Sequence, residues 1–284
     1  MIRALRQHWP EYLMEAAALG MFIVSAALFT ALFEYPGSPV HRAIPNGFLR
    51  HALIGLAMGL TAIGIIYSPW GQQSGAHMNP AMTLSFLRLK KIKPWDALFY
   101  IVGQTVGGVC GILFAKLLLG SIITHPSVNY VVTVPGPAGP SVAFIAEAII
   151  AGGMMFMVLS VTNTPRLARF TGSFGGALVF LYITFEAPLS GMSINPARTT
   201  ASALPSGIWT AAWVYFTAPI LGMFVAVETY RGLKGLARLA CPKYHHGTKQ
   251  RCIFCGHPGQ AKAVSASSSG SARACKVSVS AATH

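Results

Sequence analysis

One eight-residue pattern occurs twice in this chain. The first copy is Ser-Gly-Ala-His-Met-Asn-Pro-Ala at residues 74–81, and the second is Ser-Gly-Met-Ser-Ile-Asn-Pro-Ala at residues 190–197. Upstream of each copy an apolar block opens with Glu-Ala, at Glu15 and at Glu147. Self-similarity of this kind indicates two equivalent structural units within one chain. The fold must therefore accommodate the same motif in two places.

Six apolar blocks are long enough to cross a membrane, which needs about 20 helical residues. They lie at about 12–33, 50–68, 95–119, 142–162, 171–187 and 208–229. Two segments that begin at Asn-Pro, 79–89 and 195–204, are too short to span. Each half thus has an odd number of spans, so the halves have opposite orientations. Such inverted repeats place their binding or conduction elements near the midplane, on discontinuous helices.

The composition excludes an ordinary soluble protein. Hydrophobic residues make up 53% of the chain and charged residues 10%, with a mean hydropathy of +0.54. A soluble domain has about 25% charged residues. The 21 Lys and Arg against 7 Asp and Glu give a net charge of +14. We attribute this excess to basic loops beside anionic lipid headgroups and not to nucleic acid, because no motif that reads nucleic acid accompanies it.

The basic residues also predict the orientation. With the N-terminus inside, the loops before the tail place eight basic residues in the cytoplasm and three outside. The inner eight are Arg3, Arg6, Arg88, Lys90, Lys91, Lys93, Arg166 and Arg169, and the outer three are Arg42, Arg50 and Lys116. This is a positive-inside bias. We therefore expect a multi-pass protein of the cell (plasma) membrane with both termini cytoplasmic, which requires an even number of crossings.

The repeated Asn-Pro-Ala is a helix start. The motif residues are Asn79, Pro80 and Ala81 in the first copy and Asn195, Pro196 and Ala197 in the second. Proline suits the first position of a helix, and asparagine before it is a favoured N-cap. Two such starts from opposite faces would bring two helix N-termini together in the membrane, each with free N–H donors and about half a positive charge. A water molecule there would accept hydrogen bonds, while hydronium would be repelled.

These motifs carry a resemblance to the major intrinsic protein family, the aquaporins and aquaglyceroporins. The resemblance covers about residues 11–230, with Ser-Gly-Ala-His-x-Asn-Pro-Ala and Asn-Pro-Ala-Arg as its specific signatures. It implies an all-α membrane protein of aquaporin-like fold, with six transmembrane helices plus two half-membrane helices in an inverted repeat. It also implies a pore within each protomer and a homotetramer.

The resemblance assigns roles to further residues. The positions that match the family's selectivity filter are Met58, Ile183, Met192 and Arg198. Arg198 would donate hydrogen bonds to the solute and repel cations. Glu15 and Glu147 would accept hydrogen bonds from the loops that carry the short helices. His77 would lie near the cytoplasmic side of the pore, although a purely structural histidine fits that position equally well.

The filter residues leave the solute open. Strict water channels typically have an aromatic residue at the first filter position and His at the second, whereas Met58 and Ile183 are apolar. Against glycerol specificity, Thr199 follows Arg198 where aquaglyceroporins usually carry Asp, and Tyr215 and Phe216 in the last span are more typical of aquaporins.

The remaining segments form the ends of the chain. We expect a cytoplasmic N-terminus at 1–10, a basic Cys/His-containing cytoplasmic tail at 231–260, and a disordered Ala/Ser-rich C-terminus at 261–284. The tail contains potential zinc ligands at Cys241, His245, His246, Cys252 and Cys255. Thiolate and imidazole suit zinc, although this spacing matches no standard finger. The alternatives are a basic tail without structure or a tail that contacts lipid.

Several functions are compatible with these features. The main hypothesis is a passive channel for water and small uncharged solutes that excludes protons and ions, and the alternative is a facilitator for glycerol or another small neutral solute. A coupled transporter would need ion-binding groups at the midplane, where only Asn79, Asn195 and Arg198 are candidates. A metal-sensing protein that acts through its tail is a further alternative. No nucleophile–base pair or cofactor loop indicates an enzyme.

Overall fold

The computed structural model of this protein describes residues 1–235, 241–246 and 249–258, and these residues form helices and connecting loops. The α-helices of the first half are α1 (Ile2–Glu34), α2 (Pro39–Ala43), α3 (Gly47–Tyr67), α4 (Pro69–Ser74), α5 (Pro80–Arg88) and α6 (Pro94–Leu119). Those of the second half are α7 (Pro140–Thr162), α8 (Thr171–Leu181), α9 (Ala187–Ser190), α10 (Pro196–Ser206) and α11 (Ala212–Lys234). Short 3-10 segments are Gly120–Thr124, Asn129–Val131 and Ala168–Phe170, and a π-helical segment at Tyr182–Glu186 continues α8.

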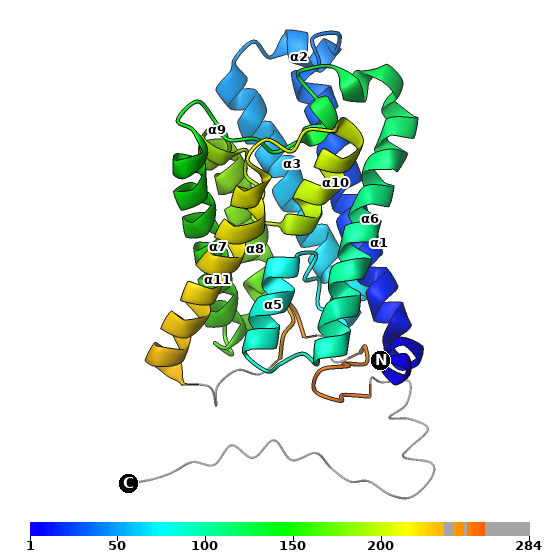
Figure 1. Cartoon of the computed structure of the whole chain (residues 1–284), viewed down its shortest axis with the longest axis vertical. Helices are drawn as coiled ribbons and strands as arrows, with labels where there is room; N and C mark the ends of the chain where they lie inside the picture. Colours follow the sequence, from blue (N-terminus) through cyan, green and yellow to red (C-terminus); the bar gives the residue numbers. More distant parts are fainter. Residues whose placement is uncertain (236–240, 247–248, 259–284) are drawn as a thin grey trace, which may run out of the picture.

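Six helices in the described part of the chain are long and apolar enough to cross a membrane. Figure 1 shows them side by side, with the short helices α5 and α10 inside the bundle near opposite ends. The predicted all-α fold of six spans and two half-membrane helices is therefore confirmed. The main difference is at the first span, where the helix begins at Ile2 and runs through Pro10 instead of starting near residue 12.

The two halves of the bundle are built alike. Helices α1 and α6 touch at Gly107, where an added Cβ would lie 2.0 Å from the carbonyl oxygen of Ala16. Helices α7 and α11 touch in the same way at Gly222, where an added Cβ would lie 2.1 Å from the oxygen of Ala148. Such close backbone contact is typical of membrane helices, which gain little from apolar burial against lipid. The contact also fixes Glu15 and Glu147, the residues just before these alanines, at equivalent places in the two halves.

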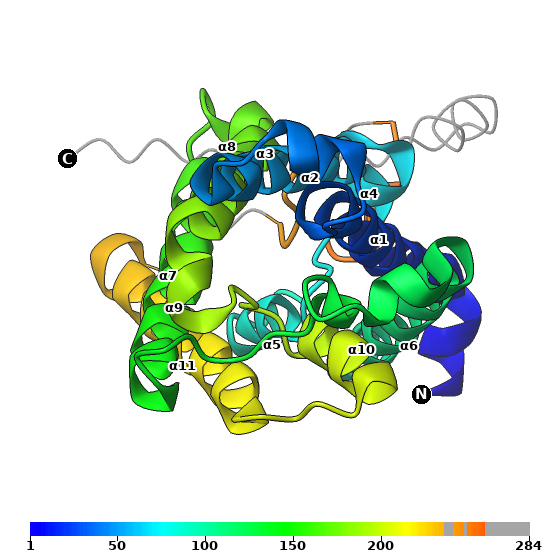
Figure 2. The same cartoon turned by 90° about the horizontal axis from the view of Figure 1, so that it is seen from above.

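The short helices approach each other from opposite ends of the bundle. We call the end where α1 begins and α11 ends the tail end, and the opposite end the far end (Figure 1). Seen from above, the two short helices lie side by side between α6 and α11, along one side of the bundle (Figure 2). Pro80 and Pro196 occupy the first positions of α5 and α10, with Asn79 and Asn195 as their N-caps. The proposed tail disorder at 261–284 lies outside the described residues.

Candidate functional site

The two Asn-Pro-Ala turns bind each other. The Asn79 amide Nδ2 donates to the carbonyl oxygen of Ile194 at 2.7 Å, and the Asn195 amide Nδ2 donates to the oxygen of Met78 at 2.7 Å. Each Oδ1 caps its own helix, with Asn79 accepting from Ala81 N at 2.9 Å. An asparagine amide carries two hydrogens, so each side chain keeps one donor beyond the bond to the opposite turn. Both asparagines line the same cavity.

A buried carboxylate supports each turn. We call residues 74–79 the first turn and residues 190–195 the second turn. Glu15 accepts from the Ser74 hydroxyl at 2.8 Å and from the backbone N–H groups of His77 and Met78 at 3.0 and 2.7 Å. Burial of these N–H groups without an acceptor would be costly, so the carboxylate stabilises the turn.

Glu147 repeats this arrangement in the second half. It accepts from the Ser190 hydroxyl at 2.9 Å and from the N–H groups of Ser193 and Ile194, both at 2.6 Å. The structure therefore brings both predicted supporting acids to the loops that carry the short helices. Their carboxylates face backbone donors and do not line the cavity.

Two tyrosines that sequence reasoning did not assign to this role complete the support. The Tyr100 hydroxyl donates to the Ser74 oxygen at 2.7 Å, and the Tyr215 hydroxyl donates to the Ser190 oxygen at 2.5 Å. Each turn also contains non-glycine residues in the left-handed region, among them Met78 at φ 50°. Such residues cost about 1–3 kcal/mol each and persist only where their surroundings hold them. The available sequence signal was a tyrosine 26 residues after Ser74 and another 25 residues after Ser190.

A cavity of about 430 Å³ passes the two turns. It reaches from the far end, where Glu34 and His51 line it, to the tail end, where Tyr244 lines it. The four residues at the expected filter positions all line this cavity: Met58, Ile183, Met192 and Arg198. Within the described residues, the buried Nη1 of Arg198 has no hydrogen-bond partner. The Arg198 side chain as a whole lines the cavity and brings its guanidinium donors there.

His77 lines the tail-end part of the cavity. Its Nε2 lies 2.8 Å from the carbonyl oxygen of Pro242, and its Nδ1 lies 3.1 Å from the Thr83 hydroxyl. Because a carbonyl can only accept, Nε2 carries the hydrogen and donates it to the tail. The second turn has Ser193 at the corresponding place, with its hydroxyl 2.6 Å from that of Thr199.

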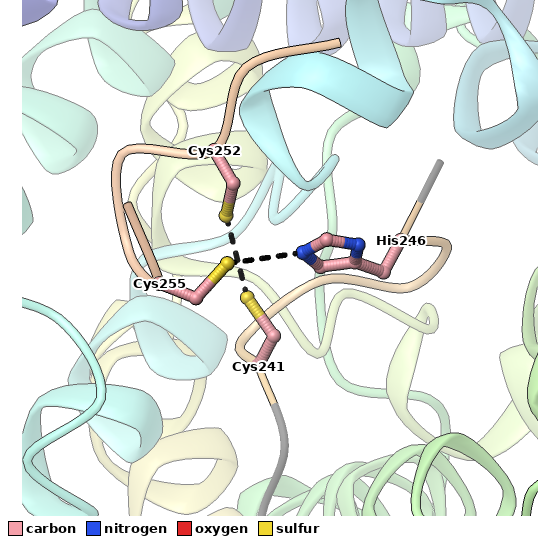
Figure 3. A group of neighbouring side chains, drawn as sticks. All are labelled: Cys241, His246, Cys252 and Cys255. Carbon is pink, nitrogen blue, oxygen red and sulfur yellow. Dashed lines mark hydrogen bonds between the residues drawn. The ribbon is translucent and has the colours of Figure 1, made fainter. Parts of the chain in front are cut away.

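The structure brings together four of the five residues proposed as zinc ligands. The Sγ atoms of Cys241, Cys252 and Cys255 and a ring nitrogen of His246 lie within 4.8 Å of one another (Figure 3). His245 is not part of this group, because its ring packs edge-on against Tyr67 at 5.3 Å. The hydrogen bond between Cys241 and Cys252 lowers the pKa of Cys252 and raises that of Cys241.

Comparison with known proteins identifies the class of molecule. The family model described as "Major intrinsic protein" matches residues 3–230. The chain belongs to the major intrinsic protein family. This confirms the resemblance inferred from the paired motifs and with it the channel class, which is not enzymatic.

Individual relatives agree with this assignment. The chain is 38% identical over 205 residues to Aquaporin NIP6-1 of Arabidopsis thaliana, a match that covers 71% of this chain and 63% of that protein. It is 35% identical over 217 residues to Aquaporin NIP2-2 of Zea mays, covering 75% of this chain and 71% of that one. Among solved structures, the aquaglyceroporin from Plasmodium falciparum shares the fold with a TM-score of 0.69 at 20% identity, covering 82% of this chain and all of that one.

Proposed function

We propose that this member of the family is a passive channel for water and small uncharged solutes, and that it excludes protons and other ions. The observation that carries the proposal is the meeting of the two Asn-Pro-Ala turns beside one cavity. The N-termini of α5 and α10 contribute positive partial charge there, and each asparagine keeps a free amide hydrogen. A passing water molecule accepts these bonds through its oxygen, so its lone pairs are occupied and it cannot accept a proton from a neighbouring water molecule.

We assign selectivity to the four filter residues. Arg198 lines the cavity and supplies a positive charge and guanidinium donors, which favour neutral solutes with a hydrogen-bond acceptor and repel cations. Met58, Ile183 and Met192 supply apolar walls. These walls offer no polar partner in exchange for water lost from a solute, so the channel admits small solutes that tolerate partial dehydration.

The proposal includes placement and assembly. The positive-inside bias favours a cytoplasmic tail end, in the plasma membrane, with both termini inside. The two ends of the described chain lie at the same end of the bundle, which agrees with an even number of crossings (Figure 1). Large apolar side chains such as Leu117 and Val225 are exposed on the outer surface, where lipid or neighbouring protomers would cover them. We propose a homotetramer with one pore in each protomer.

Stopped-flow light scattering on proteoliposomes tests the channel function. We expect faster osmotic water efflux than in empty vesicles, with no proton leak in vesicles that contain a trapped pH dye. Water permeability equal to that of empty vesicles, under both metal-loaded and metal-free conditions, would overturn the proposal.

A facilitator for glycerol or a similar small neutral solute is the second candidate. The apolar Met58, Ile183 and Met192 favour it, because they replace the polar or aromatic groups of a narrow water filter. The same vesicles decide between the two candidates when glycerol and urea entry are measured beside water efflux. Glycerol entry that exceeds the empty-vesicle rate, without increased water efflux, would favour the facilitator.

A further inference from the structure

The four-residue cluster in the tail has the donors and spacing of a tetrahedral zinc site. The Cys241 and Cys252 sulfurs are 3.4 Å apart, and His246 Nε2 lies 3.2 Å from the Cys255 sulfur (Figure 3). Zinc–sulfur bonds of about 2.3 Å in tetrahedral geometry place neighbouring ligand atoms about 3.7 Å apart. The four side chains converge on one point from two loop segments, 241–246 and 249–258, as a metal site requires.

The backbone around the cluster is arranged to present these ligands. We call the described residues 241–246 and 249–258 the tail loop. Between Cys252 and Cys255 the chain makes a tight turn that Gly256 closes, with φ +76° and its N–H 3.0 Å from the Cys252 oxygen. Cys252 N donates in return to the His257 oxygen at 2.8 Å. Both sulfurs of the Cys-x-x-Cys pair therefore point to the same side of the turn.

Two basic residues attach the tail loop to the bundle. Lys243 is 1% exposed, and its Nζ donates to the carbonyl oxygens of Gln72 and Gln73 at 2.9 and 2.8 Å. Arg251 forms an ion pair with Glu11 on α1, at 2.6 Å between Nη2 and Oε2. A buried lysine needs specific partners, because an unpaired buried charge is costly. The loop therefore sits in a defined position at the tail end.

The tail loop also contacts the first turn and the cavity. The Pro242 oxygen accepts from His77, and Tyr244 N donates to the Gly75 oxygen at 3.2 Å. The Phe254 ring stacks on the His77 ring, with centroids 5.9 Å apart. Tyr244 is buried and lines the tail-end part of the cavity. Part of the pore wall thus comes from a segment that follows all six spans.

We propose that Zn²⁺ bound by Cys241, His246, Cys252 and Cys255 folds the tail loop against the tail end of the pore, where Tyr244 restricts passage. The proposal rests on the channel function proposed above. The tail loop is too short to bury a core of its own, and small units of this kind depend on a metal or another cross-link for their fold. Loss of zinc therefore frees Tyr244 and opens the pore.

Metal content tests the site directly. Purified full-length protein, reduced and exposed to Zn²⁺ alone, is expected to retain one zinc per chain after gel filtration. Cobalt in place of zinc is expected to give the visible absorption of tetrahedral thiolate coordination. Cys252→Ser is expected to lose both signals, and Cys110→Ser, an exposed cysteine on α6, is expected to keep both. Wild-type protein without stoichiometric zinc, or with a Cys241–Cys252 disulfide under reducing conditions, would overturn the metal site.

Water efflux from proteoliposomes tests the restriction. If the tail loop closes the pore about 90% of the time, its release raises permeability roughly tenfold. We expect this rise on zinc chelation in wild type and, without chelator, in Cys252→Ser. Tyr244→Ala is expected to keep its zinc and still show the rise, whereas Cys110→Ser is expected to behave as wild type. Unchanged or lower permeability in zinc-free protein would overturn the restriction, even if zinc binds.

The two proposals fail in distinguishable ways. If zinc binds but neither loaded nor zinc-free protein conducts more than empty vesicles, the channel proposal fails. If the protein conducts equally with and without zinc, the channel proposal stands and the tail-loop proposal fails.

Discussion

The first and second turns have the same internal bonds and different surroundings. In both, a glutamate accepts from a serine and two backbone N–H groups, and a tyrosine hydroxyl holds the serine carbonyl. The first turn is covered by the tail loop through His77 and Gly75, whereas the second turn leads to Arg198 and the far end of the cavity. The repeat in the sequence thus gives two turns with the same supporting bonds. The residues around each turn make the two ends of the cavity different. In the functions proposed above, one end restricts passage and the other selects the solute.

The largest effect is expected from removal of the supporting acids. Glu15→Ala and Glu147→Ala each leave two buried N–H groups without an acceptor, at about 1–3 kcal/mol per group, so we expect each to lower unfolding stability by ~2–6 kcal/mol. Thermal unfolding in detergent measures the loss. A loss below about 1 kcal/mol in either variant would contradict the supporting role.

Zinc removal sharpens the comparison between these two variants. Of the two turns, only the first is bonded to the tail loop within the described residues, so chelation is expected to add to the loss in Glu15→Ala and to affect Glu147→Ala no more than wild type. Unfolding free energies of wild type and variant, each with and without zinc, form a thermodynamic cycle that gives the coupling free energy between the mutation and zinc removal. Equal coupling in both variants would show that the tail loop does not act on the first turn.

The capping asparagines are expected to rank next. Asn79 caps one N–H group, whereas Asn195 caps those of Ala197 and Arg198, and each also donates to the opposite turn. Loss of an N-cap costs about 1–2 kcal/mol, so Asn79→Ala and Asn195→Ala should each destabilise by about this amount, with Asn195→Ala the more severe. Chemical unfolding of the two variants in one detergent compares them. The reverse order would contradict the geometry of the caps.

The tyrosines should give a smaller and equal effect. Tyr100→Phe and Tyr215→Phe each remove one hydrogen bond to a serine carbonyl and keep the ring in place. Hydrogen bonds between membrane helices contribute about 0.6 kcal/mol on average, so we expect a loss of this size in both variants. Thermal unfolding of both variants, at the same protein and lipid concentrations, measures this loss of stability. A much larger loss in one variant would show that the two halves are supported unequally.

Arg198→Ala should affect stability least, because its buried Nη1 has no partner among the described residues. We expect faster entry of urea and glycerol by roughly threefold, equivalent to about 0.65 kcal/mol of barrier, and weaker exclusion of cations. Tyr244→Ala at the other end should raise the flux of every admitted solute in proportion. Unaltered solute ratios and ion exclusion in Arg198→Ala would remove it from the filter.

The amino-acid pattern alone predicted the family, the six spans, the two half-membrane helices and the inverted repeat. These features depend on local chemistry, namely apolar blocks of membrane length and an Asn-Pro start that suits a helix N-terminus. The roles of Glu15 and Glu147 came from the resemblance, and the structure supplies the bonds. Residues at filter positions were found by counting from the motifs, but their solute preference depends on the shape of the cavity.

Other features depend on contacts between segments far apart in the chain. The sequence could not separate His246 from His245, because only the folded tail loop directs one ring to the cysteines and the other to Tyr67. It also gave no sign that Tyr244 lines the pore, or that Pro242 binds His77, which lies 165 residues earlier. Local propensity determines where helices begin and end. Which side chains meet is decided by the packing of the whole bundle, and here that packing places the tail at the mouth of the pore.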